Sequence, residues 1–229
     1  MIDFPYETSG IFLALTMLVV GSIIDVWKRE IHDYFWMGFG GVGFSLVFLS
    51  SDIVGNLVIM GFSLIVAPFV ILMWRMGLFG GADAFALIAL AVIAPLATFG
   101  ENIVTPFTTL SNAAILFVIP FIVNFIRNII SQAKGKDIFE GFEETTSKKV
   151  LAMLMGYKAK NPKFAFSIEK TVKGKKKLDL KIHHAENQEF CTTPDTWITP
   201  GIPYLLLITA GFIIQLVYGD IIVSRFLGM

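Results

Sequence analysis

Residues 11–25 read IFLALTMLVVGSIID, fourteen uncharged residues followed by Asp25. A run this apolar is typical of a helix in a lipid bilayer, where the segment must satisfy its own backbone hydrogen bonds. The rest of the chain has the same character: 55% of its 229 residues are hydrophobic, 16% are charged and the net charge is zero. Soluble domains carry roughly 25% charged residues. The composition therefore excludes a disordered chain, a nucleic-acid-binding domain and an ordinary cytosolic enzyme.

The apolar runs predict an all-α membrane protein with six transmembrane helices. The expected spans are 10–26, 34–50, 54–74, 83–99, 110–129 and 202–222. None of them alternates in the way that the strands of a membrane barrel do. Several are shorter than the roughly 20 residues that cross a bilayer, so we expect the helices to run on into polar ends or the bilayer to thin locally.

One polar insert interrupts this hydrophobic body. Residues 131–199 hold 22 of the 36 charged side chains. The predicted division is therefore five helices in 1–130, a cytosolic insert domain in 131–199 and a sixth helix in 200–229.

The insert has the sequence pattern of a small α+β domain. Apolar residues at helical spacing predict a helix over about 147–158, capped by Thr145 or Thr146. Alternation in Lys163–Glu169 and again in Lys177–Lys181 predicts a β-hairpin.

Thr171–Lys175 would form the turn of that hairpin. The basic run Lys173–Lys177 at its tip fits a solvated turn best, and contact with anionic lipid headgroups is the alternative.

Lysine and arginine positions predict the topology. Lys28 and Arg29 lie after the first span, Arg75 after the third, and Arg127 with thirteen lysines after the fifth, whereas the linkers after spans two and four have none. Odd-numbered linkers are therefore expected in the cytoplasm and both chain ends outside, with Arg225 as the single exception. The N-terminal run lacks a basic leader, so we interpret it as a mature span and not a cleavable signal peptide.

Cysteine and histidine content argues against a metal centre. Cys191 is the one cysteine, which excludes an internal disulfide and zinc sites that need two cysteines. His183 and His184 are neighbours, so on a strand they point to opposite faces. No metal and no cofactor is expected.

A G-x-G-x-x-G pattern occurs at Gly38, Gly40 and Gly43. It lies inside an apolar span with no strand before it, so close packing of helices explains it better than a dinucleotide site.

Acidic residues at membrane depth carry the functional signal. Five of the nine acids outside the insert are expected at outer ends, where water solvates them: Asp3, Glu7, Asp52, Glu101 and Asp220. Asp25 and Asp83 instead lie at the cytoplasmic ends of uncharged spans, where an ionisable group is costly.

Taken singly, each of these two acids has a structural explanation. Asp83 can cap a helix, and Asp25 can pair with Lys28 or Arg29 one turn away. Together, two carboxylates at matched depth on separate helices can share a proton, polarise a peptide carbonyl and activate water.

Three motifs resemble those of type IV prepilin and archaeal preflagellin peptidases. Residues 25–33, DVWKREIHD, resemble the family's D-x-x-x-R-E-I-x-D stretch, and residues 80–83, GGAD, resemble its G-x-G-D motif. Residues 200–204, PGIPY, are similar to a P-x-x-P-aromatic helix start. One departure is Ala82, where the family motif has glycine; a methyl group fits if the backbone there has a negative φ.

The resemblance implies an intramembrane aspartyl protease of the G-x-G-D type, with Asp25 and Asp83 as the catalytic pair. Its substrates would be filament subunits with a class III signal peptide, which has a short basic leader cut after glycine at the cytoplasmic membrane face. Gly80, Gly81, Gly201 and Pro203 would provide non-helical backbone for the unwound substrate.

Glu30 and Asp33 would attract the basic leader, although ordinary solvated acids are the simpler interpretation of both. The polar insert and the lack of cysteine pairs resemble the archaeal branch, and we expect a preflagellin peptidase with a prepilin peptidase as the alternative. From other classes, a small proton-coupled transporter and a non-catalytic scaffold that binds a partner through the insert also remain open.

Overall fold

The computed structural model describes residues 4–172, 174–180 and 188–227. Contacts divide the chain into two compact units. The first comprises Met1–Leu116 and Pro203–Met229, and the second comprises Phe117–Ile202. The predicted His183 and His184 pair, Lys173, and the end of the second predicted strand lie outside the described residues.

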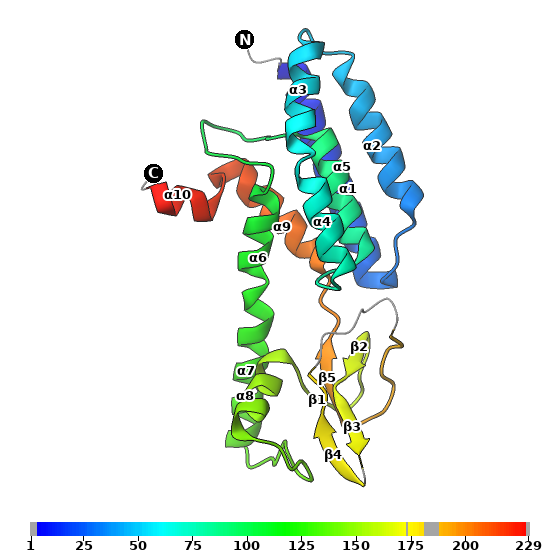
Figure 1. Ribbon diagram of the computed structural model, residues 1–229, viewed down its shortest axis with the longest axis vertical. Coiled ribbons are helices and arrows are strands. Elements are labelled where there is room, and N and C mark those ends of the chain that lie inside the picture. The colour runs from blue at the N-terminus through cyan, green and yellow to red at the C-terminus, as the bar shows by residue number, and fades with distance from the viewer. Residues whose placement is uncertain (1–3, 173, 181–187, 228–229) are drawn as a thin grey trace. The chain divides into compact units, whose positions relative to one another are not determined.

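The first unit consists of helices (Figure 1). They are α1 (Phe4–Lys28), α2 (Asp33–Val47), α3 (Ile53–Ser63), α4 (Val66–Arg75), α5 (Gly81–Ile93), α6 (Thr108–Leu116), α9 (Tyr204–Tyr218) and α10 (Ile221–Leu227). Helix α5 packs against α1, α2, α3, α4 and α9. Eight of its thirteen residues are buried, so α5 is the centre of this unit.

The core of this unit is apolar, and so are the outward faces of its helices. Ala86, Leu87 and Ile93 of α5 are buried together with Leu205 and Phe212 of α9. On the outside, large apolar side chains stay exposed along α2, α3 and α4, among them Met37, Val54 and Leu72. Water does not favour such a surface, whereas lipid does. The unit is therefore built for a membrane.

Three helical stretches among the described residues are long and apolar enough to cross a bilayer: Tyr6–Lys28, Ile53–Arg75 and Thr108–Ala133. Gly81–Ile93 and Tyr204–Tyr218 are apolar but shorter, and α2 has 15 residues. The chain is thus a multi-pass membrane protein, and its full set of six spans stays a prediction.

Prolines explain where the helices break inside the predicted spans. Pro68 has no N–H to donate to the carbonyl of Leu64. The chain passes from α3 to α4 at that point, and the N–H of Ala67 donates to the Leu64 carbonyl instead (3.0 Å). Pro120 is likewise four residues after Leu116, where α6 ends.

The predicted span 83–99 is wrong in its second half. Helix α5 ends at Ile93, and Ala94 leaves the helical region with φ −139° and ψ 60°. Pro95 follows, and a proline disfavours helical backbone in the residue before it. Residues 94–107 therefore form a loop and a turn instead of more helix.

The second unit begins with α7 (Val118–Ala133) and α8 (Thr146–Met155), and its described residues then form short strands, β1 to β5. Strands β1 (Tyr157–Ala159) and β2 (Ala165–Ser167) both pair antiparallel with β5 (Thr196–Pro200). Strands β3 (Glu169–Val172) and β4 (Lys175–Leu178) form a separate antiparallel hairpin. The predicted helix over about 147–158 is confirmed as α8, but it ends at Met155, and residues 157–158 belong to β1. Thr145 is at the N-cap position, without a capping hydrogen bond from its side chain.

The predicted hairpin is shifted along the chain. Its second strand overlaps β4, but its first strand is Glu169–Val172 and not Lys163–Glu169. Residues 165–167 pair with β5 instead. The alternation in Lys163–Glu169 correctly indicated a half-buried strand, but alternation alone does not identify a partner.

Trp197 is the centre of the second unit's core. Its side chain is fully buried, its ring stacks on Phe139 at 4.7 Å, and its indole N–H donates to the carbonyl of Ile138 (2.7 Å). Asn128 of α7 donates to the carbonyls of Met153 (2.9 Å) and Gly156 (2.7 Å) at the end of α8. These bonds satisfy carbonyls that the end of a helix leaves without an internal partner.

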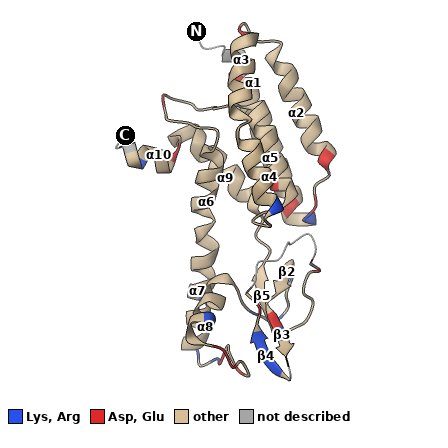
Figure 2. Ribbon diagram, in the orientation of Figure 1, with Lys and Arg blue, Asp and Glu red and all other residues tan. Residues whose placement is uncertain are grey.

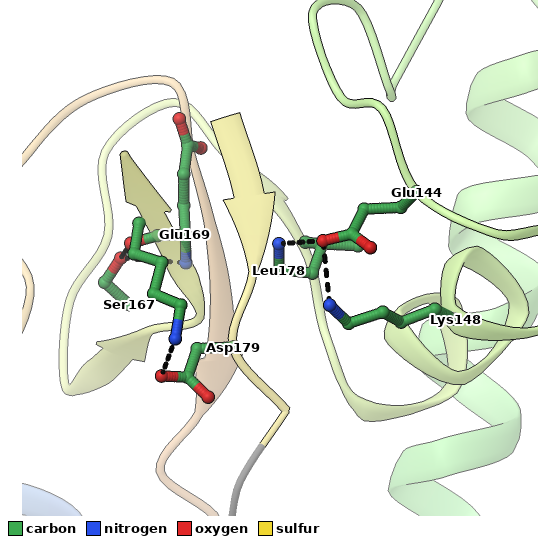
Figure 3. A network of polar contacts seen from close by, with 7 residues as sticks. Glu144, Lys148, Ser167, Glu169, Leu178 and Asp179 are labelled. Atoms are coloured by element: carbon green, nitrogen blue, oxygen red, sulfur yellow. Dashed lines mark hydrogen bonds and ion pairs between the residues drawn. The ribbon is translucent and has the colours of Figure 1, made fainter. Parts of the chain in front are cut away.

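A polar network ties α8 to the hairpin (Figure 3). Glu144 accepts from Lys148 Nζ (2.8 Å) and from the backbone N–H of Leu178 (2.9 Å). On the hairpin itself, Lys170 pairs with Asp179 (2.8 Å). The hairpin of this unit therefore has a defined attachment to α8.

The glycines of the G-x-G-x-x-G pattern differ in their packing. Of the three, only Gly43 packs closely, against Ile93 of α5, whereas Gly38 and Gly40 face open space.

Asp220 is not solvated as expected: it is 2% exposed and accepts from Ser111 Oγ (3.0 Å) and the N–H of Val223 (3.0 Å). Asp220 therefore caps the N-terminus of α10.

Candidate active site

Asp25 lies in the last turn of α1 and is half-buried. The backbone N–H of Arg29 donates to the carbonyl of Asp25 (3.0 Å). Arg29 itself takes the left-handed conformation, with φ 60°, which ends α1 and turns the chain toward α2. The charge of Arg29 also acts on the Asp25 carboxylate. Arg29, one turn away, is thus the basic residue whose charge acts on Asp25.

Asp83 lies in the first turn of α5 and is only 8% exposed. Its Oδ2 accepts from the backbone N–H of Gly80 (3.1 Å), the residue before the helix. Asp83 therefore has the helix-capping function that its position indicated, and a carboxylate is favoured at a helix N-terminus. That one bond leaves Oδ1 and further lone pairs for other partners.

The structure brings the two carboxylates into electrostatic reach of each other. The charge on Asp25, from the end of α1, acts on Asp83, at the start of α5. Figure 2 shows that the charged residues of α1 to α5 lie near helix ends, among them the region where α1 ends and α5 begins, while the middles of these helices carry none. Two carboxylates that interact in an apolar setting can hold one proton between them.

Tyr204 is a neighbour of this pair that is not among the predicted site residues. Its hydroxyl interacts electrostatically with Asp83. Its ring stacks on Phe79, with centroids 5.7 Å apart and planes 6° apart. The aromatic position of the P-x-x-P-aromatic motif was the signal that could have identified it.

The backbone before Asp83 accommodates Ala82. Gly80 is extended, with φ −78° and ψ 162°, and α5 begins at Gly81. Ala82 is absent from the described non-glycine residues with positive φ, so its methyl group is compatible with the backbone. Of the two glycines, only Gly80 offers non-helical backbone. A methyl group on Gly81 would lie 3.1 Å from the ring of Trp74, so glycine allows close packing there.

The other expected substrate-binding residues lie in both units. Pro203 precedes α9 in the first unit with φ −71° and ψ 87°. Gly201 belongs to the second unit, where its N–H donates to the carbonyl of Phe164 (2.9 Å). Glu30 and Asp33 are exposed in the α1–α2 connection and at the start of α2. Their proposed roles toward a substrate remain predictions.

Metal-binding clusters of three or more His, Cys, Asp or Glu side chains do not occur among the described residues. The groups that the described structure places at this site are carboxylates and their hydrogen-bond partners. Two carboxylates of this kind suit acid–base work on a neutral, poorly reactive bond.

The chain is similar to known proteins over nearly its whole length. A family described as "Archaeal Peptidase A24 C-terminus Type II" matches residues 137–221. A preflagellin peptidase of Methanocaldococcus jannaschii is 29% identical, with 93% of this chain and 94% of the relative covered. A preflagellin peptidase of Methanococcus voltae is also 29% identical, covering 95% and 98%. A third, from Methanococcus maripaludis, is 26% identical, covering 89% and 92%.

The family match covers the second unit from residue 137 onward, together with α9. The resemblance of the three sequence motifs agrees with this likeness along the chain. The chain is therefore related to preflagellin peptidases along nearly its whole length and to the archaeal peptidase A24 family over residues 137–221, and these likenesses indicate an aspartic endopeptidase.

Proposed function

We propose that Asp25 and Asp83 are the catalytic pair and that the enzyme removes the class III signal peptide from preflagellin subunits at the cytoplasmic membrane face. The observation that carries this proposal is the pairing itself. Asp83 is buried in an apolar core, and the charge of Asp25, on another helix, acts on it. The names of the three relatives support preflagellin as the substrate class.

The chemistry needs one protonated and one ionised carboxyl group. The ionised group takes a proton from water as the water oxygen attacks the scissile carbonyl carbon. The protonated group donates its proton to the carbonyl oxygen, which gives a neutral tetrahedral diol. The diol then collapses as a proton passes to the amide nitrogen, the C–N bond breaks, and both product termini leave.

The position of the pair fits a substrate with a basic leader and an apolar helix. The leader stays in the cytosol and the apolar part enters the membrane, so the scissile bond lies at the interface. Glycine before the cut removes side-chain bulk, and the non-helical backbone at Gly80 and Pro203 offers partners to the unwound peptide. Glu30 and Asp33, exposed near the end of α1, attract the leader.

Replacement of each aspartate tests the catalytic pair. In membranes containing the full chain, Asp25→Asn and Asp83→Asn are each expected to abolish leader removal from a preflagellin. The side-chain amide of asparagine cannot donate and accept the proton that the mechanism transfers. Asp52→Asn is the matched control: Asp52 caps α3 through the N–H of Gly55 (2.9 Å), and asparagine caps equally well. Normal cleavage by either of the first two variants, at wild-type protein levels, would contradict the proposal.

A side-by-side assay separates preflagellin from prepilin processing. Two substrates that differ only in the leader, one from a preflagellin and one from a type IV prepilin, are mixed with the same membranes. Faster cleavage of the preflagellin leader is expected. Preference for the prepilin leader would leave the catalytic pair intact and change only the substrate assignment.

A further inference from the structure

Helix α7 has two faces of different character. One face turns buried Asn124 and Asn128 toward α8, where both side chains donate to backbone carbonyls at the end of that helix. Another face carries an aliphatic stripe of exposed side chains at helical spacing: Ile119, Val123, Ile126 and Ile130. Because α7 belongs to a stretch that is long and apolar enough to cross a bilayer, Thr108–Ala133, hydrocarbon is the environment that suits this stripe.

A hollow of about 440 Å³ lies where the aliphatic stripe ends, and we refer to it as the α7 hollow. Its described walls are three side chains of the stripe, one hydroxyl and three cations: Val123, Ile126, Ile130, Ser131, Arg127, Lys134 and Lys136. All of them belong to α7 or to the turn that follows it. None of the described lining residues is acidic, so the hollow is strongly positive.

The three cations of the α7 hollow have no ion-pair partner within the described part of the chain. The ion pairs found there involve four other lysines: Lys148, Lys170, Lys175 and Lys176. Three of these four lie on or beside the β3–β4 hairpin, so acids of the second unit neutralise much of the hairpin's charge. Asp137 follows Lys136 in sequence, but its carboxylate accepts from the N–H of Phe139 (3.0 Å) and does not line the hollow.

Arg127 is already held in place for an anion. Its guanidinium carbon lies 3.6 Å from the centroid of the Tyr157 ring. Stacking of this kind fixes the planar group by its face and leaves the N–H groups at its edge free to bond to phosphate oxygens. The end of a helix carries a partial negative charge of only about half a unit, so the three full positive charges determine the field.

We propose that the α7 hollow binds the phosphate of an anionic membrane phospholipid whose acyl chain lies along the aliphatic stripe. Arg127 donates to the phosphate oxygens, Ser131 offers a further O–H, and the two lysines balance the remaining charge. Ile119 and Ile130 are eleven residues apart, which is about 16 Å along the helix axis. That length is close to half of the roughly 30 Å hydrocarbon core of a bilayer, so one lipid molecule covers both the stripe and the hollow.

Lipid titration of the purified full chain tests the site. The protein is stripped of lipid in detergent and titrated separately with phosphatidylglycerol, with phosphatidylcholine of the same acyl chains, and with inorganic phosphate. Native mass spectrometry counts the bound molecules. Phosphatidylglycerol is expected to bind about fivefold more tightly than phosphatidylcholine, because the choline cation adds one repelled charge near the hollow. Inorganic phosphate is expected to bind far more weakly than either lipid, since it has no acyl chain.

Variants of the cations locate the binding. Lys134→Gln with Lys136→Gln is expected to weaken phosphatidylglycerol binding about 25-fold, at about fivefold for each cation removed. Lys160→Gln with Lys163→Gln is the matched control, because it removes two cations from exposed positions elsewhere in the second unit. The control is expected to bind as the wild type does.

Ser131 gives an independent test inside the hollow. Ser131→Glu places a carboxylate among the three cations and is expected to abolish tight binding of phosphatidylglycerol, whereas Ser131→Thr keeps the hydroxyl and is expected to bind normally. If Ser131→Glu does not fold, the double lysine variant alone decides.

Three results would overturn the proposal. Equal affinity of the wild type for the two lipids would remove the preference for an anionic headgroup, and equal losses in the two double lysine variants would show an effect of net charge alone. Inorganic phosphate binding as tightly as the lipid would exclude a lipid as the occupant. Asp25→Asn is expected to keep normal lipid binding, so the outcome is independent of the catalytic assignment.

Discussion

The stacked rings of Phe79 and Tyr204 join the turn before Asp83 to the start of α9. Phe79 precedes Gly80, whose N–H bonds to the Asp83 carboxylate. Because such a ring pair is worth about 0.5–1.5 kcal/mol beyond its buried area, it holds the carboxylate's only described backbone donor in place. The pair is therefore a positioning device for Asp83.

We predict that Phe79→Ala lowers kcat about fivefold, with little change in KM, because about 1 kcal/mol of positioning is lost. Phe79→Tyr keeps the stacking and should restore most of kcat. Steady-state cleavage of a leader peptide in detergent micelles measures both constants. A rise in KM with an unchanged kcat would instead indicate that Phe79 contacts the substrate.

Glu144 makes the second unit sensitive to acid. Its hydrogen bond to Lys148 lowers the pKa of its carboxyl group below the ordinary value, and the N–H of Leu178 acts in the same direction, while burial opposes both. Because the folded pKa is the lower one, the charged form stabilises the fold above the unfolded pKa. That contribution is lost as the pH falls through the folded pKa.

We therefore expect hydrogen exchange in β4 and α8 of the full chain to become faster, relative to unfolded-chain rates, as the pH drops below about 4.5. Glu144→Gln should exchange faster at neutral pH and lose this dependence on pH. Glu140→Gln, at an exposed neighbouring position, serves as the control. Identical pH profiles for wild type and Glu144→Gln would contradict the assigned role of Glu144.

Helices α6 and α9 make the most extensive helix contact of the first unit, and glycine allows it. A methyl group on Gly211 of α9 would lie 2.7 Å from the carbonyl oxygen of Thr109 and 2.9 Å from the backbone nitrogen of Ala113. Both are backbone atoms of α6, so neither can move without shifting the helix. Small residues at membrane helix contacts have this function generally.

Gly211→Ala is thus predicted to destabilise the protein by about 1–3 kcal/mol, the usual cost of overpacking. Gly40→Ala is the matched control, since Gly40 of α2 faces open space and alanine favours a helix by about 0.5–1 kcal/mol. Thermal unfolding in one detergent compares the two. A lower Tm for Gly40→Ala than for Gly211→Ala would exclude this packing explanation.

Hydropathy located the helices but not their breaks or the small sheet. The apolar runs around Pro68 and Pro120 are continuous in composition, while the backbone hydrogen bonds that proline removes are local. Strand β5 has five residues and lies about thirty residues after its partner β2, so only long-range pairing defines it. Its Trp197 is the core residue that the sequence pattern did not identify.

The aspartates were found because a charge beside an uncharged run is visible in the sequence. Their positions at helix ends predicted a matched depth in the membrane. The electrostatic interaction between them depends on how α1 packs on α5 within the whole bundle. The same holds for Tyr204, which lies far from Asp83 in sequence and interacts with it in the fold. The order of residues along the chain indicates neither of these two interactions.

Orientation in the membrane is a property of the whole molecule, and the positive charges predict it. Lys28, Arg29 and the thirteen lysines of 131–199 are expected in the cytoplasm, with the linker after α2 outside. Cys191 is the one thiol of the chain and is partly exposed in the second unit. It can therefore report on which side of the membrane the insert lies.

A membrane-impermeant maleimide added to intact cells is expected to leave Cys191 unlabelled and to label it only after the membrane is opened. In Cys191→Ser with Ser51→Cys, at an exposed position between α2 and α3, labelling of intact cells is expected. The two thiols would then lie on opposite sides of the bilayer, which requires α2 to cross it although the helix has only 15 residues. Labelling of both from the same side would remove α2 from the set of spans, and with it the six-span architecture.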